Sequence, residues 1–256
     1  MTNTGHLIDT TKNMLRRELT VRYAGSFLGP FWSVLYPVIF TLITATIFSS
    51  FFNKSIEGIP YFLYVLIGFN CWFWFNLTIS NATRSIINNR ELIVNNKFPS
   101  ESIIFSIVGV RLVDHIINFS LLVILLLLIN QKLTLTGILL IVYISSCQLL
   151  LQTGISLITA SLNAYVRDLQ NFVDILLQLA FYSTPIIYST SILPDQLQKI
   201  ALFNPLAIIV ISYRNAIFNR AIQTEPLAYI LLVSGFTFLL GYIIYKKLEN
   251  KFAELI

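Results

Sequence analysis

The amino-acid sequence predicts an all-α membrane protein with six transmembrane helices. Of its 256 residues, 56% are hydrophobic and only 11% are charged, whereas a typical soluble domain carries about 25% charged residues. The apolar residues are gathered into long runs that approach the ~20 residues a helix needs to cross a bilayer. Backbone groups in lipid must be hydrogen-bonded internally, which leaves helices and closed barrels. Residues 119–129 do not alternate between apolar and polar as barrel strands do, so helices are predicted.

The first element is an amphipathic helix over residues 5–22. Ile8, Leu15 and Leu19 share one face of it, and basic residues lie beside that face. This pattern is typical of a helix that lies at the lipid headgroups; the alternative is a short soluble helix packed on another cytoplasmic element. The first 29 residues carry no apolar core or cleavage-like site of a signal peptide, so we expect the N-terminus to stay in the cytoplasm.

Six apolar segments follow as the predicted spans. They cover residues 30–52, 60–80, 103–129, 136–162, 172–188 and 226–245. Pro30 suits the first turn of its helix, where a missing N–H costs little. Pro37 is expected to kink the first span, and Pro185 interrupts the fifth.

Two connections have more structure than linkers. Residues 81–100 are polar but contain several Ile, Leu and Val residues, which predicts a short amphipathic helix that a partner grips. Residues 189–225 are too polar and too broken by proline for a plain span, yet 200–203 and 206–211 are strongly apolar. We predict two short helices that dip into the membrane edge, with protein or water covering the backbone between them.

The distribution of basic residues predicts the orientation of the chain. The predicted inner segments hold 12 Lys and Arg residues and the outer segments hold 5, which together make the 17 in the chain. The positive-inside rule then places both termini in the cytoplasm. It also explains the net charge of +5 without a nucleic-acid partner. We expect one permease domain over 1–256, with an interfacial helix in 1–29, the spans in 30–246 and a cytoplasmic tail in 247–256.

The motifs of a catalytic chain are missing from the sequence. It has no Gly-x-x-x-x-Gly-Lys-Ser/Thr loop for nucleotide phosphates, so any ATP hydrolysis must take place on another chain. Metal-ligand spacing and a Gly-x-Ser-x-Gly elbow are also missing. We therefore expect no enzyme, no metal and no cofactor in this chain. Cys71 and Cys147 lie in apolar stretches and are expected to be small buried hydrophobic residues, and His6 and His115 are expected to be structural.

Charged and aromatic residues in the spans are the candidates for function. Arg111 and Asp114 are three residues apart, so we expect them to pair on one helix face near its cytoplasmic end. Asp114 and Asp174 alone are a weak basis for a proton relay. Aromatic rings at several positions could form an interfacial belt, or a channel whose rings stack on sugars. These positions are Trp32, Tyr36, Trp72, Trp74, Phe75, Tyr182 and Tyr188.

Three sets of motifs carry a resemblance to a known family. The first is Arg-Tyr-Ala-Gly-Ser-Phe-Leu-Gly-Pro-Phe-Trp-Ser at 22–33, continuing to Pro37. The second is Asn-Ala-Tyr-Val-Arg-Asp-Leu at 163–169, followed by Thr-Pro-Ile-Ile-Tyr-Ser at 184–189. The third is Asn-Pro-Leu at 204–206, with Arg214 nine residues after the proline. Together they resemble the permeases of polysaccharide-export ABC transporters, which include the O-antigen (Wzm-type), capsule and teichoic-acid exporters.

This resemblance implies an architecture and a function. It implies a homodimer of six-span subunits in the bacterial inner membrane, paired with two copies of a cytoplasmic ABC ATPase that binds ATP and Mg. It implies a coupling helix after the second span, re-entrant gate helices before the sixth, and a channel at the dimer interface lined by the first and fifth spans. The substrate would be a lipid-linked polysaccharide, such as an O-antigen-like glycan on a polyprenyl diphosphate.

The resemblance also assigns roles to residues. The channel or substrate candidates are Trp32, Tyr36, Trp72, Trp74, Tyr182 and Tyr188. The candidates for coupling to the ATPase are Arg84, Arg90, Glu91, Lys97, Arg167 and Asp168. Other functions remain open: an ABC exporter of another lipid-linked polymer or of a small molecule, or a glycolipid-modifying membrane enzyme. A secondary transporter would show inverted repeats, and the sequence shows none.

Overall fold

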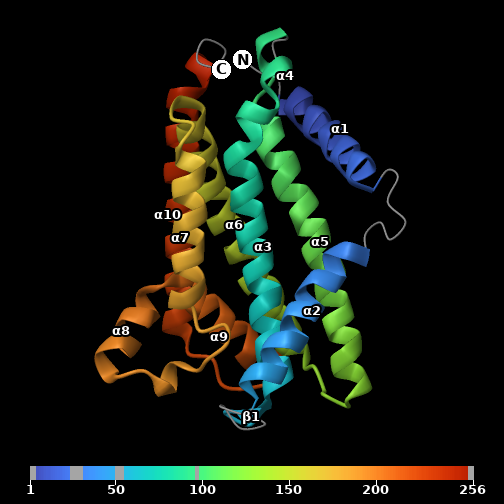
Figure 1. Ribbon diagram of the computed structural model, residues 1–256, viewed down its shortest axis with the longest axis vertical. Helices are drawn as coiled ribbons and strands as arrows, with labels where there is room; N and C mark the ends of the chain where they lie inside the picture. The colour runs from blue at the N-terminus through green and yellow to red at the C-terminus, as the bar shows by residue number, and fades with distance from the viewer. Residues whose placement is uncertain (1–3, 24–30, 50–54, 96–97, 253–256) are drawn as a thin grey trace.

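The computed structural model is a bundle of α-helices and confirms the all-α class (Figure 1). It describes residues 4–23, 31–49, 55–95 and 98–252. Its helices are α1 (Thr4–Tyr23), α2 (Phe31–Phe48), α3 (Tyr61–Asn88), α4 (Arg90–Asn95), α5 (Glu101–Leu128), α6 (Leu135–Tyr165), α7 (Leu169–Ser183), α8 (Asp195–Phe203), α9 (Pro205–Ile217) and α10 (Thr224–Leu248). Short 3₁₀ turns follow at Thr190–Ile192 and Glu249–Lys251. Two short strands, β1 (Ser55–Ile56) and β2 (Ile59–Pro60), form a hairpin.

Among the described residues, four helices are long and apolar enough to cross a membrane. These are α3, α5, α6 and α10, which coincide with the second, third, fourth and sixth predicted spans. The pair α8–α9 passes the same test together, but the two helices are bent by 93° at Asn204. Two short helices thus lie between α7 and α10, and their dip into the membrane edge remains a prediction. The apolar part of α2, Leu35–Phe48, and the 15 residues of α7 are shorter than a full span, so the count of six remains a prediction.

Helix α3 extends beyond the second predicted span. Helix α3 continues through the polar residues after Ser80 to Asn88, and only then does the short helix α4 begin. A helix does not have to end where its apolar run ends, because its backbone bonds continue as long as its side chains are solvated or paired. Arg84 therefore lies on α3 and not in a separate connection.

Helix α3 is the centre of the bundle. In its most apolar 18-residue window 78% of the residues are buried, against 17% in α10. It packs against α2, α5, α6, α7 and α9. A helix that is apolar all round and enclosed by protein is a core helix, whereas one that is apolar and exposed faces lipid. Helix α10 is of the second kind, since Leu232, Phe236 and Ile243 are all more than 60% exposed.

The close contact between α6 and α10 depends on glycine. A Cβ atom at Gly154 would lie 2.5 Å from the carbonyl oxygen of Thr237, and one at Gly241 would overlap the backbone of Gly154. Small residues at a crossing let two backbones approach, which is the usual basis of helix association in membranes. The position of α10 is thus set by backbone contact with α6.

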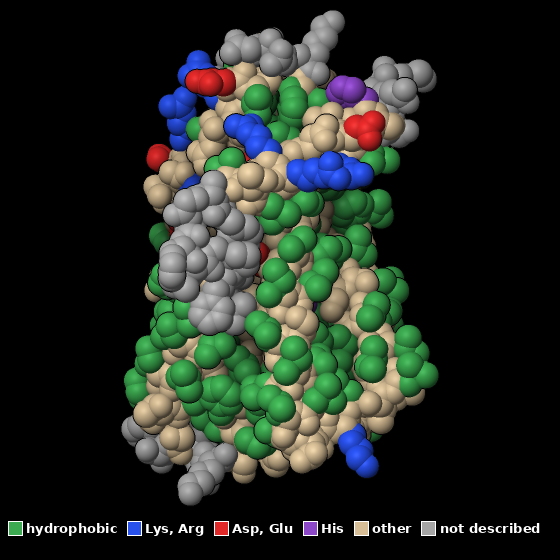
Figure 2. Space-filling model, turned by 90° about the vertical axis from the view of Figure 1, so that its right-hand side faces the viewer, with side chains coloured by type: hydrophobic (Ala, Val, Ile, Leu, Met, Phe, Trp, Pro, Cys, Tyr) green, Lys and Arg blue, Asp and Glu red, His purple; other side chains and the backbone are tan. Residues whose placement is uncertain are grey.

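The two described ends of the chain lie at the same end of the bundle, together with α4 (Figure 1). We call this the terminal end and the opposite one, which holds β1 and β2, the hairpin end. Helix α1 packs on α5, with Met14 buried and Leu15 against Gly109, while Ile8 and Val21 are exposed. Figure 2 shows charged side chains gathered near the terminal end and mostly hydrophobic ones below it.

Two expectations about single residues are confirmed. Cys71 and Cys147 are buried free thiols. Arg111 and Asp114 form an ion pair of 3.0 Å within α5.

We predict that Gly154→Ala lowers the free energy of unfolding by about 1–3 kcal/mol, since the added methyl group meets backbone and cannot be accommodated by a side-chain movement. Thermal unfolding of the detergent-solubilised protein measures this. The matched control is Gly235→Ala on α10, where a Cβ meets nothing within 4 Å. Equal melting temperatures for the two variants would contradict the packing argument.

Candidate functional site

A pocket of about 430 Å³ lies between α2, α3 and α7. Its described lining residues are Tyr36, Phe40, Trp72, Asn76, Asp174, Leu177, Gln178, Phe181 and Tyr182. Three helices from distant parts of the sequence supply them, because α2 and α7 both pack on the central helix α3. The pocket is therefore a property of the folded bundle and not of any one segment.

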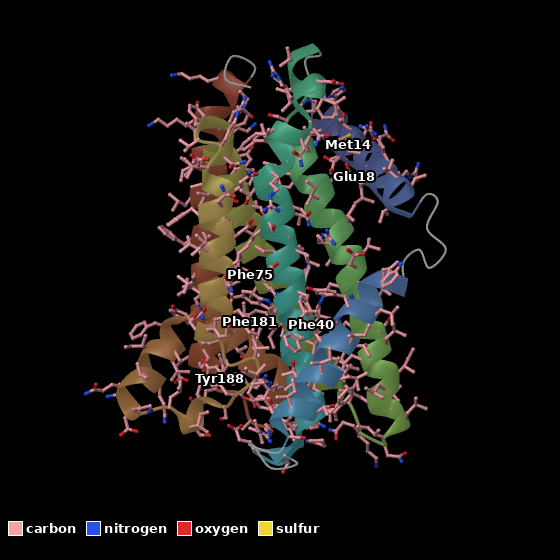
Figure 3. The ribbon with its side chains drawn as sticks, in the orientation of Figure 1. Met14, Glu18, Phe40, Phe75, Phe181 and Tyr188 are labelled. Atoms are coloured by element: carbon pink, nitrogen blue, oxygen red, sulfur yellow. The ribbon has the colours of Figure 1, made fainter. Side chains whose placement is uncertain are left out.

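Aromatic rings form the part of the pocket toward the hairpin end. Tyr36 and Phe40 of α2 have ring centroids 4.6 Å apart. Trp72 of α3 contacts Phe181 of α7 edge-on, with 5.4 Å between the ring centroids. Figure 3 shows Phe40 and Phe181 at the same level of the bundle. Such rings offer flat apolar faces at fixed positions, which suits the apolar face of a sugar ring.

Polar side chains form the part of the pocket nearer the terminal end. Asn76 on α3 and Gln178 on α7 carry amides that can both donate and accept hydrogen bonds. Asp174, one turn before Gln178, forms an ion pair with Arg84. Ser80 completes the group: it donates to Asp174 Oδ1 at 3.3 Å and accepts from Arg84 Nη1 at 2.9 Å.

Three of the six predicted channel residues line this pocket: Tyr36, Trp72 and Tyr182. Trp32 lies one turn before Tyr36 on α2 and is 57% exposed, outside the lining. Trp74 is directed elsewhere, because its buried ring stacks on the imidazole of His115 at 3.8 Å. Tyr188 follows α7 and donates its hydroxyl to the carbonyl of Tyr182 at 2.8 Å (Figure 3).

Sequence reasoning missed much of the lining. Phe40, Asn76, Leu177, Gln178 and Phe181 were not predicted, and Asp174 was considered only for a proton relay. A signal was present in the spacing, because Asp174, Gln178 and Phe181 are four and three residues apart and share one helix face. The same holds for Asn76, Ser80 and Arg84 along α3.

The coupling candidates lie at the terminal end. Arg90 and Glu91 are exposed on α4, and Arg167 and Asp168 are exposed between α6 and α7. Lys97 falls outside the described residues, and Arg84 is engaged with Asp174.

The loop that carries Arg167 and Asp168 is held by Asn163. This side chain donates to the carbonyl of Thr83 on α3 at 3.0 Å and accepts from the backbone N–H of Gln170 on α7 at 3.0 Å. It therefore joins α6 to both α3 and α7 beside this exposed loop.

At the hairpin end, Arg214 of α9 joins the second and third sequence motifs. Its guanidinium, 2% exposed, donates to the carbonyl oxygens of Tyr64, Pro185 and Ile186 at 2.7–3.2 Å and lies 3.4 Å above the Tyr64 ring. These bonds attach the segment after α7 and the helix α9 to α3.

Asn204, at the bend, supports the same arrangement. It caps α9 by accepting from Leu206 N at 3.0 Å and donates to Thr184 at 3.0 Å.

The hairpin of β1 and β2 also contacts the segment after α7 and the residues after α9. Glu57 and Gly58 both have positive φ, of 51° and 74°, as a two-residue type I′ turn requires. The Glu57 carboxylate accepts from Ser189 and pairs with Arg220 at 3.2 Å. Among the described residues, no group of His, Cys, Asp and Glu could hold a metal ion.

The comparisons with known proteins agree with this architecture. A sequence profile described as ABC-2 type transporter matches residues 10–218. The chain belongs to the ABC-2 type transporter family. The O-antigen export system permease protein RfbA of Klebsiella pneumoniae is 31% identical over 255 residues, which are 99% of this chain and 97% of that protein. A protein of the same description from Myxococcus xanthus is 30% identical over 94% of this chain and 93% of its own length.

A third relative is more distant. The polysialic acid transport protein KpsM of Escherichia coli is 24% identical to this ABC-2 chain over 94% of each sequence. The resemblance to polysaccharide-export permeases, predicted from the motifs, is thereby confirmed. The family and the apolar helices together make this ABC-2 chain a multi-pass membrane protein of a transporter.

We predict that Arg214→Gln destabilises the ABC-2 chain by at least about 3 kcal/mol, because several buried hydrogen bonds to a charged donor are lost together. The melting temperature in detergent measures this. Arg220→Gln is the control: it breaks an ion pair in which the Arg side chain is 32% exposed, and exposed pairs contribute about 0–1 kcal/mol. A similar loss in both variants would show that burial of Arg214 has no special weight.

Proposed function

We propose that this chain is the membrane subunit of an ATP-driven exporter that moves a lipid-linked polysaccharide across the bacterial inner membrane. The substrate class we favour is an O-antigen-like glycan carried on a polyprenyl diphosphate. The observation that carries the proposal is the pocket between α2, α3 and α7, in which aromatic rings and amides lie side by side. Support comes from the full-length relatives described as O-antigen export and polysialic acid transport proteins.

The pocket chemistry suits a glycan better than an apolar solute. A sugar ring has an apolar face that packs on an aromatic ring and hydroxyls that need hydrogen-bond partners around it. Trp72 and Phe181 supply faces of the first kind, and Asn76 and Gln178 supply partners of the second. A long polymer needs such surfaces along a path and does not need one enclosed site.

The pocket is bordered by exposed apolar faces that suit a second copy of the chain. Ile39 and Ile43 of α2 are 43% and 55% exposed, and Leu179 and Tyr182 of α7 are 60% and 64% exposed. A homodimer that faces these helices toward each other would enclose a path between them. In this arrangement we count α2 and α7 as the first and fifth of six spans per subunit.

ATP must be used by a partner, since the chain has no phosphate-binding loop. The terminal end is the surface we assign to two copies of a cytoplasmic ABC ATPase, which places both termini in the cytoplasm. Exposed charges on α4 and on the α6–α7 loop are available for that contact. Rigid helices pressed into a moving partner transmit its motion to the spans.

Export of another lipid-linked polymer or of a small molecule is a second candidate, favoured only by the breadth of the family. A glycolipid-modifying enzyme is disfavoured, because the charged pocket residue Asp174 is paired with Arg84 and has no second carboxylate among the lining residues described.

We predict that Trp72→Ala together with Phe181→Ala reduces glycan export at least about tenfold, since two stacking surfaces are lost, each worth on the order of 1 kcal/mol. Cell-surface glycan of the native host, with the level of the chain in the membrane, measures this. Phe236→Ala on the exposed face of α10 is the matched control. Unchanged export with both pocket rings removed would contradict the assignment of the path.

We predict that reversing the charges of Arg90 and Asp168 (Arg90→Glu with Asp168→Lys) releases a soluble ATPase that otherwise co-purifies with the chain in mild detergent. Reversal of exposed charges opposite a complementary surface costs several kcal/mol. Lys199→Glu, on α8 away from the terminal end, is the control. A wild-type preparation with no ATPase would contradict the proposed mechanism.

A further inference from the structure

The ion pair between Arg84 and Asp174 has no evident structural need. It joins α3 to α7 at the polar part of the pocket, where Asn163 already ties both helices to α6. The side chains are 38% and 43% exposed, and pairs this exposed contribute little to stability. A weak ion pair beside a pocket is better explained by a ligand that binds one of the two side chains in place of the other.

The geometry makes Asp174 the partner that can be replaced. Asp174 lines the pocket, whereas Arg84 is not among the lining residues. The Arg84 side chain contacts Asp174 and Ser80, which separate it from the pocket. The guanidinium is a planar donor that binds phosphate oxygens with two parallel hydrogen bonds, as it binds a carboxylate. An anion that enters the pocket from the terminal end would thus meet Arg84 at the site that Asp174 now occupies.

The position agrees with the route of an amphiphile. Arg84 lies one turn before the end of α3 at Asn88, so it is close to the level at which lipid headgroups would lie. Asn76 and Ser80 continue the same face of α3 from Arg84 toward the aromatic rings. An anionic group held at Arg84 would place whatever is attached to it against the amides first and the rings next.

We propose that Arg84 is the docking point for the diphosphate of the lipid-linked substrate, and that Asp174 holds this position until the diphosphate displaces it. This inference rests on the proposed function. Displacement removes the direct link between α3 and α7 beside the pocket, while Asn163 still joins both helices to α6. Asp174 and Arg84 are positioning residues for the headgroup and take no part in any covalent step.

The test compares two substitutions that both break the ion pair. The full-length chain, with the subunits that co-purify with it, is placed in nanodiscs of neutral lipid, and binding of geranylgeranyl diphosphate is measured by calorimetry. Loss of a charged donor in Arg84→Gln should weaken binding about tenfold. In Asp174→Asn the carboxylate no longer competes for Arg84, so binding of geranylgeranyl diphosphate should strengthen about two- to fivefold. Arg84→Lys, which keeps the charge but not the planar fork, should give an affinity between those of the wild type and Arg84→Gln.

Opposite signs for the two substitutions support the proposal, since a merely structural pair would shift both variants the same way. Equal weakening in both, or no change in either, overturns it. The double variant Arg84→Gln with Asp174→Asn should match Arg84→Gln alone. Inorganic pyrophosphate and geranylgeraniol are the comparison ligands. Pyrophosphate binding as tight as that of the lipid would overturn the lipid-linked form of the ligand.

Failure of this inference and failure of the proposed function give different results. A wild-type chain that exports glycan, with diphosphate affinity unaffected by Arg84→Gln, overturns the docking point alone. A chain whose deletion leaves surface glycan unchanged overturns the proposed function and the inference with it.

Discussion

The buried guanidinium of Arg214 is the interaction on which the hairpin end of this protein depends. A charge placed in the apolar part of a membrane protein is costly unless polar groups surround it. Here the carbonyl oxygens of Tyr64, Pro185 and Ile186 do so, and the Tyr64 ring covers one face. The carbonyls after α7 in turn gain a donor where the helix has ended and its own N–H groups no longer reach them. The guanidinium and the carbonyl oxygens thus satisfy each other's hydrogen-bonding capacity.

This contact sets the geometry of the pocket. Gly68 faces the same guanidinium, and a Cβ there would lie 2.8 Å from Nη2 and 2.9 Å from the carbonyl of Ile186. Helix α3 therefore approaches the segment after α7 as closely as backbone allows. Because α7 ends at a fixed point on α3, the rings of Phe181 and Tyr182 in its last turn are held beside Trp72.

The pocket that results has two chemically different parts along one path. Toward the hairpin end it offers aromatic faces, and toward the terminal end it offers amides and a charged pair. The bonds at the two ends of α7 also differ. Buried hydrogen bonds from Arg214 hold the segment after its last turn, whereas at the terminal end Asn163 and an exposed ion pair with Ser80 hold the helix. A partner that moves the terminal end would act on the part of α7 that carries the exposed ion pair.

Much of the fold was predictable from the sequence, and most of the pocket was not. The apolar runs of α3, α5, α6 and α10 are long enough to be recognised by composition alone, and the broken segment before α10 was marked by Pro194 and Pro205. Ion pairs between residues far apart in the sequence could not be predicted in this way. Arg84 and Asp174 are 90 residues apart, and only the packing of α7 on α3 brings them together.

Helical geometry explains why Trp74 lies away from this pocket while Trp72 lines it. Trp72 and Trp74 are two residues apart, so their side chains leave α3 in nearly opposite directions and cannot both face one pocket. The sequence alone does not distinguish the two tryptophans. The structure places Trp72 beside α7 and Trp74 against His115 of α5.

The exposed ion pair of α7 also makes its attachment to α3 sensitive to dissolved ions, as the exposed pair of Glu57 and Arg220 is at the hairpin end. Exposed charges are screened over a Debye length of about 8 Å at physiological ionic strength, whereas buried hydrogen bonds are not. Raising the salt concentration therefore weakens the pair between Arg84 and Asp174 while leaving the bonds of Arg214 intact. The ionic strength at the terminal end therefore changes the strength of this direct link between α3 and α7, while Asn163 still joins both helices to α6.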